Sequence, residues 1–185
     1  MRKVYLFMMV SLDGFFEGPE HDLSWHNVDS EFNVFADKQL DESSTLVFGA
    51  RTYQMMANFW PTEIGITAAP NTAKRMNSID KIVFSRTLKK AEWNNTELHN
   101  GDISTVIQNA KEKPGKDIAV LGSSDLCLSL IKEGLLDEIR IMVNPVVLGR
   151  GKTLFSGITK QLKRELTSER TFKSGNVLLT YKLHK

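Results

Sequence analysis

Hydrophobic positions along the chain form short continuous runs that alternate with longer stretches of helical spacing. The runs at 4–10, 45–48, 81–86 and 117–121 favour β-strands, and continuous apolar runs are typical of strands buried on both faces. Between them, apolar residues recur every three or four positions, as they do on one face of a helix. Strands that alternate with helices predict βα units and a largely parallel sheet.

Helices are predicted in four of the intervening stretches. They run from Asp29 or Ser30 to about residue 42, over 52–60, from Asp102 or Ser104 to 113, and from about 124 to Gly134. Asp, Ser and Thr are good N-caps, and a proline, here Pro61, disfavours helical geometry in the residue before it. The stretches at 13–28 and 61–80 are expected to be loops, the first with Trp25 as its one large apolar anchor.

The C-terminal part changes from this alternation to strands joined by turns. A long strand is expected over 138–148, with Pro145 inside it as the sign of a bulge or an edge. Strands over 166–172 and 176–183 flank a Ser-Gly turn and predict an antiparallel hairpin, and 91–98 is expected to add a short edge strand. The predicted fold class is therefore α/β, with a mostly parallel central sheet.

Composition limits the classes of function that the chain can have. With 185 residues, of which 41% are hydrophobic, we expect a single domain over 1–185. A formal net charge of +2 excludes a global field that would attract nucleic acid or an anionic membrane. The one cysteine, Cys127, excludes an internal disulfide and is expected to be a buried helix residue.

Several common sites are absent from the sequence. The apolar run at 1–10 is too short to span a membrane and leads to no cleavage site, so a soluble, cytoplasmic protein is expected. The four histidines have no paired spacing, so no metal site is expected. They are His21, His26, His99 and His184. Neither a Gly-x-Ser-x-Gly nucleophile motif nor a P-loop lysine motif occurs.

Two strands end at a glycine that leads into a predicted helix. After 45–48 comes Gly49-Ala50-Arg51-Thr52, in which Thr52 can cap the helix and Arg51 adds a positive charge. Glycine allows a ligand close to the backbone, and free N–H groups at a helix start favour an anion. A phosphate cradle and an ordinary βα turn explain this sequence about equally well. After 117–121, Gly122-Ser123-Ser124-Asp125 repeats the pattern, although ordinary helix capping explains it better when it is taken alone.

A third strand end carries Ser85-Arg86-Thr87. An arginine beside a hydroxyl suits a ribose 2′-phosphate, whereas taken alone a surface arginine is the simpler explanation. All three strand ends fall on the same edge of a parallel sheet, so together they predict a dinucleotide site. No G-x-G-x-x-G sequence follows the first strand, which excludes the usual dinucleotide fingerprint.

Acidic residues give weaker indications. Asp13, followed by Gly14 at the end of the first strand, is either a substrate-site carboxylate that binds a hydroxyl or relays a proton, or only a turn former. Asp29 and Glu31 stand at the start of a predicted helix, where acids are favoured electrostatically, and we interpret both as capping residues.

The order of these segments resembles the dihydrofolate-reductase-like superfamily, in particular the reductase domain of riboflavin biosynthesis, the RibD C-terminal type, and its stand-alone bacterial relatives. The resemblance covers nearly the whole chain. Its carriers are Met9–Gly14, Phe48–Tyr53, Val83–Arg86, Val120–Ser123, Asp137–Ile139 and Pro145–Gly149. It implies a three-layer sandwich and an NADPH-dependent reductase.

The resemblance also implies roles for individual residues. The cofactor would be bound by Val10 and Ser11 at the nicotinamide, by Gly49, Arg51 and Thr52 at the phosphates, by Ser85 and Arg86 at the 2′-phosphate, and by Gly122, Ser123, Ser124 and Leu126 at the pyrophosphate. Asp13, Trp25 and Gly149 would face the substrate, with Asp13 as the catalytic residue. Arg150 and Lys152 are candidates for binding a ribose phosphate.

Two features of the better-known members are missing or unassigned. A folate-reducing enzyme is expected to carry a carboxylate inside the first helix, and none of Asp29, Glu31 and Asp37 can be assigned to that position from the sequence. The ligands of the zinc deaminase that often accompanies riboflavin-pathway reductases are absent.

The function expected is reduction of a small heterocyclic or carbonyl-like substrate, similar to a riboflavin precursor or a pterin. The alternatives are a nucleotide-binding protein of the same fold without turnover and a structural protein without a ligand. The long strand at 138–148 and the apolar final strand make a homodimer an expectation as well.

Overall fold

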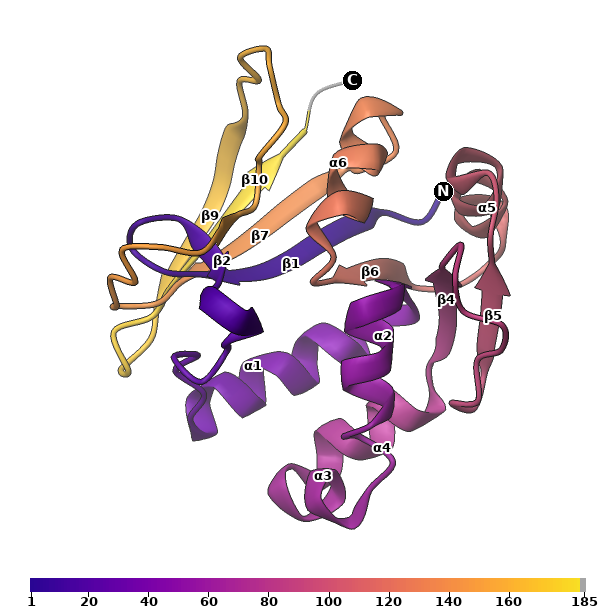
Figure 1. Cartoon of the computed structure of the whole chain (residues 1–185), viewed down its shortest axis with the longest axis horizontal. Coiled ribbons are helices and arrows are strands. Elements are labelled where there is room, and N and C mark those ends of the chain that lie inside the picture. The colour runs from indigo at the N-terminus through magenta and orange to yellow at the C-terminus, as the bar shows by residue number, and fades with distance from the viewer. Residues whose placement is uncertain (184–185) are drawn as a thin grey trace.

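A mostly parallel sheet forms the middle of the molecule. The computed structural model describes residues 1–183, and within them eight strands pair in the order β5-β4-β3-β6-β1-β7-β10-β9 (Figure 1). These strands are β1 (Val4–Val10), β3 (Ser43–Gly49), β4 (Asp80–Phe84), β5 (Thr96–His99), β6 (Asp117–Leu121), β7 (Glu138–Val143), β9 (Glu165–Thr171) and β10 (Val177–Lys182). From β5 to β7 all neighbours are parallel, and β10 is antiparallel to both β7 and β9. The predicted fold class and hairpin are confirmed.

Helices cover both faces of this sheet. They are α1 (Ser30–Asp41), α2 (Ala50–Ala57), α3 (Glu63–Ala68), α4 (Pro70–Ser78), α5 (Ile103–Glu112) and α6 (Ser124–Lys132), with a short 3₁₀ helix η1 (Pro19–His21). Helices α5 and α6 lie on one face, whereas α1, α2 and α4 lie on the other (Figure 1). The arrangement is the three-layer sandwich that the sequence predicted.

Strand β1 is buried on both faces, as its continuous apolar run predicts. Val4, Leu6 and Met8 belong to the cluster that packs under α5 and α6, together with the fully buried Leu130. Tyr5 points to the opposite cluster beneath α1, α2 and α4. Because successive side chains of a strand point to opposite faces, one apolar run supplies both cores.

A third cluster joins α1 to the C-terminal hairpin. Met9, Phe35, Met142, Phe172 and Leu178 are buried together, and the rings of Phe35 and Phe172 meet edge-on at 5.6 Å. Helix α1 begins where the sequence placed it, because Asp29 Oδ1 accepts a hydrogen bond from the Phe32 N–H at 2.8 Å. This cluster fixes α1 across one end of the sheet.

The prediction of a loop over 61–80 is wrong in part, because this stretch contains α3 and α4. Thr62 caps α3 by accepting a hydrogen bond from the Gly65 N–H, and Pro70 occupies the start of α4. A proline stops a helix that precedes it but suits the first helical position of one that follows it. The buried pair Ala73 and Met76, three residues apart, was the available helical signal.

Three further boundaries differ from the prediction. Strand β7 ends at Val143 instead of 148: the Asn144 N–H makes the last bond to β1, at 2.7 Å from the Val10 carbonyl, and the Val146 N–H then turns back to the Asn144 carbonyl at 2.8 Å. The edge strand β5 is shorter than 91–98. Helix α2 begins at Ala50 with Gly49 as its N-cap, so Thr52 lies inside the first turn and does not cap the helix.

Two composition-based expectations can be compared with the structure. Cys127 is fully buried on α6, as predicted, and burial raises the pKa of its thiol to about 12. Among residues 1–183, every helix falls short of the length and apolar character needed to cross a bilayer.

The two-sided core makes a specific prediction about stability. Leu130→Ala removes a fully buried side chain under α6 and should lower the free energy of unfolding by about 2–5 kcal/mol, since transfer and cavity costs add. Val34→Ala on the exposed side of α1 is the control and should change it by less than about 0.5 kcal/mol. Urea unfolding followed by circular dichroism measures both, and similar losses in the two variants would contradict this core.

Candidate functional site

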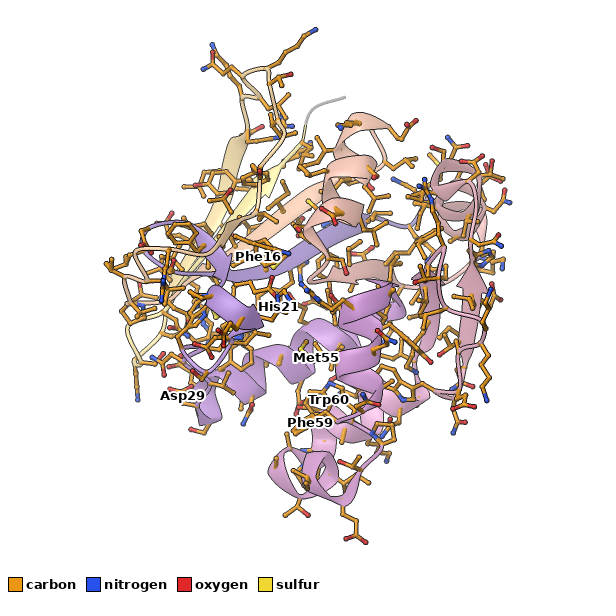
Figure 2. The ribbon with its side chains drawn as sticks, in the orientation of Figure 1. Phe16, His21, Asp29, Met55, Phe59 and Trp60 are labelled. Atoms are coloured by element: carbon orange, nitrogen blue, oxygen red, sulfur yellow. The ribbon has the colours of Figure 1, made fainter. Side chains whose placement is uncertain are left out.

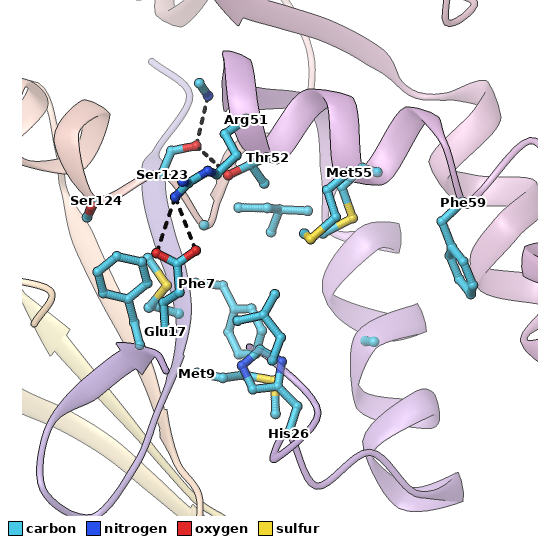
Figure 3. A pocket seen from close by; sticks show the side chains of 18 of the residues that line it. Phe7, Met9, Glu17, His26, Arg51, Thr52, Met55, Phe59, Ser123 and Ser124 are labelled. Carbon is cyan, nitrogen blue, oxygen red and sulfur yellow. Dashed lines mark hydrogen bonds and ion pairs between the residues drawn. The ribbon is translucent and has the colours of Figure 1, made fainter. Parts of the chain in front are cut away.

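One large cavity opens beside the C-terminal ends of the central strands. Its volume is about 760 Å³, and its walls come from β1, β2, α1, α2, α4 and the start of α6 (Figure 3). Both predicted glycine turns line it: residues 49–52 on one side and 121–126 on the other. Of the predicted cofactor-binding residues, the structure brings seven together here. They are Gly49, Arg51, Thr52, Gly122, Ser123, Ser124 and Leu126.

The two glycine turns are hydrogen-bonded to each other through one hydroxyl group. Ser123 Oγ accepts from the Gly49 N–H at 2.8 Å and donates to Thr52 Oγ1 at 3.0 Å (Figure 3). A side chain on Gly122 would place its Cβ 3.0 Å from Thr52, and this glycine has a φ of +63°. Glycine at this position therefore permits both the turn and the close approach of α2.

Ser123 itself has the left-handed conformation, with φ 63° and ψ 69°. A non-glycine residue in this region costs of order 1 kcal/mol or more, and such residues concentrate at functional sites. The strain is retained because the Ser123 hydroxyl joins the two turns. Its place directly before α6 also leaves that helix without a side-chain cap.

The helices that start at these turns are not capped in the way that α1 and α5 are, and α4, which begins at Pro70, also lacks a side-chain cap. Asp29 and Asp102 cap α1 and α5 through side-chain hydrogen bonds. Helices α2 and α6 have no side-chain cap, and their first turns line the cavity. Uncapped N–H groups and the positive end of the helix dipole favour a bound anion.

A nearly buried carboxylate, Glu17 of β2 (Phe15–Glu17), also lines the cavity and was missed in the sequence. Its side chain is 7% exposed and contacts Arg51 Nη1 at 3.1 and 3.2 Å, His21 Nδ1 at 2.8 Å and Lys152 Nζ at 3.6 Å. Lys152 belongs to β8 (Lys152–Thr153), which pairs with β2. Phe16 of β2 and Met55 of α2 also line the cavity (Figure 2).

The rest of the cavity is mostly apolar. Its walls include Phe7 and Met9 of β1, Phe32 and Ala36 of α1, Met55 of α2, and Phe59, which follows α2 (Figure 3). Polar side chains here include the amides of Asn33 and Gln39 and the imidazole of His26. A chamber of this kind excludes water and suits a planar, largely uncharged molecule.

None of the acids at the start of α1 or within it lines the cavity. Asp29 caps the helix, and Glu31 accepts from Arg170 at 3.0 Å and from the Lys173 N–H at 2.9 Å. Asp37 accepts from Thr72 at 2.6 Å. Helix α1 therefore presents the amides of Asn33 and Gln39 to the cavity and no carboxylate, so the feature expected of a folate-reducing enzyme is absent from this helix.

His26 lies in the cavity wall as a neutral imidazole. Burial lowers its pKa to about 4, and its Nε2 atom is buried without a hydrogen-bond partner among residues 1–183. The ring of Trp25 meets it edge-on at 4.4 Å and restrains it, while the Trp25 indole N–H donates to the Asp22 carbonyl. Trp25, which was predicted to contact substrate, therefore packs against His26 of the cavity wall and does not line the cavity itself.

Other predicted residues lie away from this cavity. Asp13 Oδ1 accepts from the Ser11 hydroxyl at 2.6 Å and Oδ2 from the Gly149 N–H at 2.7 Å; the Ser11 bond is the main cause that lowers the pKa of Asp13. Asp13 thus fills the turn-forming role that the sequence left open, and its catalytic role stays a prediction. Val10 and Ser11 are buried next to the lining residue Met9, not in the lining.

The third strand end also lies outside the cavity lining. Ser85 Oγ accepts from the N–H groups of Thr87 and Leu88 at 3.1 and 2.9 Å and so shapes the turn after β4. Arg86 is exposed there, and no ion pair holds its guanidinium within the described part of the chain. Because β4 neighbours β3, Arg86 is on the same sheet edge as Gly49.

The histidines do not converge. His21 contacts Glu17 and Arg51, His26 faces the cavity, His99 lies on β5, and His184 lies outside the described residues. A search of residues 1–183 finds no group of three metal-ligating side chains.

The model of one protein family, the RibD C-terminal domain, matches residues 2–178. The chain belongs to this family. One relative of this chain is the uncharacterized protein YyaP of Bacillus subtilis (strain 168). It is 32% identical over 180 residues, which are 97% of this chain and 94% of YyaP.

Several solved structures have the same fold as this RibD C-terminal domain. A putative riboflavin biosynthesis protein from Shewanella sp. PV-4 has a TM-score of 0.73 at 22% identity and covers 99% of both chains. Dihydrofolate reductase from Enterococcus faecalis, complexed with NADP(H) and RAB-propyl, has a TM-score of 0.63 at 17% identity and covers 99% of this chain and 97% of its own. The fold is dihydrofolate-reductase-like, and the family supports a reductase-type role.

The buried imidazole predicts a pH-dependent stability. Unfolding returns the pKa of His26 from about 4 to its ordinary 6.5, so between these values the unfolded chain binds a proton that the folded chain does not. The free energy of unfolding should therefore fall as pH drops from 6.5 to 4, by up to about 3 kcal/mol. Urea unfolding across this range tests it: His26→Asn should flatten the curve and His99→Asn should not, and equal slopes in both variants would contradict it.

Proposed function

We propose that the protein is an NADPH-dependent reductase that transfers a hydride to a small heterocyclic or carbonyl-like substrate. One observation carries the proposal: two uncapped helix N-termini, joined by Ser123, open into the same largely apolar cavity. The helix starts suit the phosphates of a dinucleotide, and the apolar chamber suits its reacting ring together with a substrate.

The residues present fit this cofactor. The first turns of α2 and α6 offer free backbone donors, and Gly122 lets the two turns lie close enough to act on one ligand. Arg51 and the exposed Arg86 supply positive charge at the two strand ends. Bound NADPH would supply the hydride.

The residues of the chain would bind and orient the reactants and keep water away from them. Phe7, Met9 and Phe32 exclude water from the reacting region, and Asn33 and His26 offer neutral hydrogen-bonding groups for orienting a substrate. Most of the rate enhancement in such a site comes from positioning, since the cofactor carries the chemistry. The absence of a carboxylate on the α1 wall favours a substrate other than folate.

A turnover assay tests the proposal directly. NADPH should raise the thermal unfolding temperature, because a ligand that binds only the folded state stabilises it, and NADPH should be oxidised with some members of a panel of heterocycles and carbonyl compounds. Binding without oxidation would instead support the nucleotide-binding protein without turnover. No thermal shift at millimolar NADPH would contradict both.

The assignment of Arg86 to the 2′-phosphate predicts a selective effect. Arg86→Ala should weaken NADPH binding about tenfold or more and change NADH binding little, because the cofactors differ only in that phosphate. Lys89→Ala, a charge removal in the same exposed turn, is the matched control and should affect neither. Isothermal titration with both cofactors measures this, and equal losses for NADPH and NADH would reject the assignment.

A further inference from the structure

Glu17 lines the cavity, and the proposed function gives this carboxylate no role. Arg51 is expected to meet a ligand phosphate, yet in this structure its Nη1 atom contacts both carboxylate oxygens of Glu17, at 3.1 and 3.2 Å (Figure 3). Glu17 therefore holds the position that an anionic ligand would take beside this guanidinium.

The backbone fixes Glu17 in this position. Strand β2 pairs with β8 so that Glu17 is opposite Lys152. Gly151, with φ +154°, lies so close that a Cβ there would be 2.3 Å from the Glu17 carbonyl oxygen. Only glycine permits this approach, and the carboxylate is held at the wall of the cavity, facing the start of α2.

His21 connects the same two charges. Its Nδ1 is 2.8 Å from Glu17 Oε1, and its Nε2 contacts Arg51 Nη2. Because a guanidinium only donates hydrogen bonds, Nε2 accepts and Nδ1 donates to the carboxylate. His21 belongs to η1, so the cluster ties the whole β2–η1 segment, residues 15–21, to the N-terminal turn of α2.

We propose that Glu17 sets the affinity for phosphate-bearing ligands by competing with them for Arg51. An incoming phosphate takes the guanidinium, and Glu17 keeps its contacts with His21 and Lys152. The inference rests on the proposed function, since it takes the ligand to be a dinucleotide bound at the two glycine turns.

The exposures of the side chains make this exchange feasible. Glu17 is 7% exposed and would be costly to leave without a positive partner, but Lys152 at 3.6 Å remains beside it. The Arg51 side chain is 55% exposed and long, so it can turn toward a phosphate without disturbing the core. The competition lowers affinity by the free energy of one partly exposed ion pair, which corresponds to a factor of about five.

The direction in which one substitution changes the cofactor affinity distinguishes this role of Glu17 from others. Glu17→Gln removes the competing charge and should tighten both NADPH and NADH about fivefold. A Glu17 that only braced the cavity wall, or that bound the ligand itself, would give weaker binding on the same substitution. Glu20→Gln, in the exposed part of η1, is the matched control and should leave both affinities unchanged.

A double-mutant cycle completes the test. Arg51→Ala should weaken both cofactors, and in that background Glu17→Gln should have no effect, because the competition needs the guanidinium. Isothermal titration gives the affinities, and thermal unfolding without ligand confirms that each variant is folded. If Glu17→Gln does not fold, Glu17→Asp withdraws the charge from Arg51 while retaining it beside Lys152, and should also tighten binding.

The outcomes distinguish the two proposals. Tighter binding in Glu17→Gln that disappears with Arg51→Ala supports the exchange. Weaker or unchanged binding in a folded Glu17 variant, with a wild-type protein that binds NADPH, overturns the exchange and leaves the proposed function intact. A wild-type protein that binds neither cofactor overturns both.

Discussion

The candidate site depends on one hydroxyl group. Ser123 Oγ accepts from the Gly49 backbone and donates to Thr52, so it connects two strand ends that are more than seventy residues apart in the chain. Without this bridge each glycine turn would be an ordinary connection between a strand and a helix. With it, the uncapped starts of α2 and α6 lie against one cavity. The strained left-handed conformation of Ser123 is therefore part of the geometry of the candidate site.

Local patterns predicted the parts of the fold and site that depend on neighbouring residues. The buried run of β1, the glycine at each strand end and the Asp29 cap are encoded within a few positions, and all three are confirmed. The helices at 61–80 were missed because Pro61 was interpreted only as the end of the preceding helix, and Pro70, which suits a helix start, was not considered. Homodimer formation and the role of Asp13 stay predictions.

Long-range contacts explain what the sequence could not show. Glu17 is the last residue of the short strand β2, directly before Gly18 and Pro19. Its partners Arg51 and Lys152 are far away in the chain. No spacing rule predicts that three segments place one carboxylate between two cations. In the same way, the motif places Val10 and Ser11 at the end of β1 but does not show that the cavity lining stops at Met9.

The C-terminal hairpin has a consequence for how such sites diversify. Phe172 packs on Phe35 of α1, and Phe35 lies 5.6 Å from the ring of Phe7, which lines the cavity. Substitutions in this hairpin, at Phe172 in its turn or at Leu178 on β10, can therefore tilt α1 and reshape the cavity wall without changing any residue that lines the cavity. In evolution, the two glycine turns can remain constant while drift in a distant hairpin adapts the chamber to new molecules.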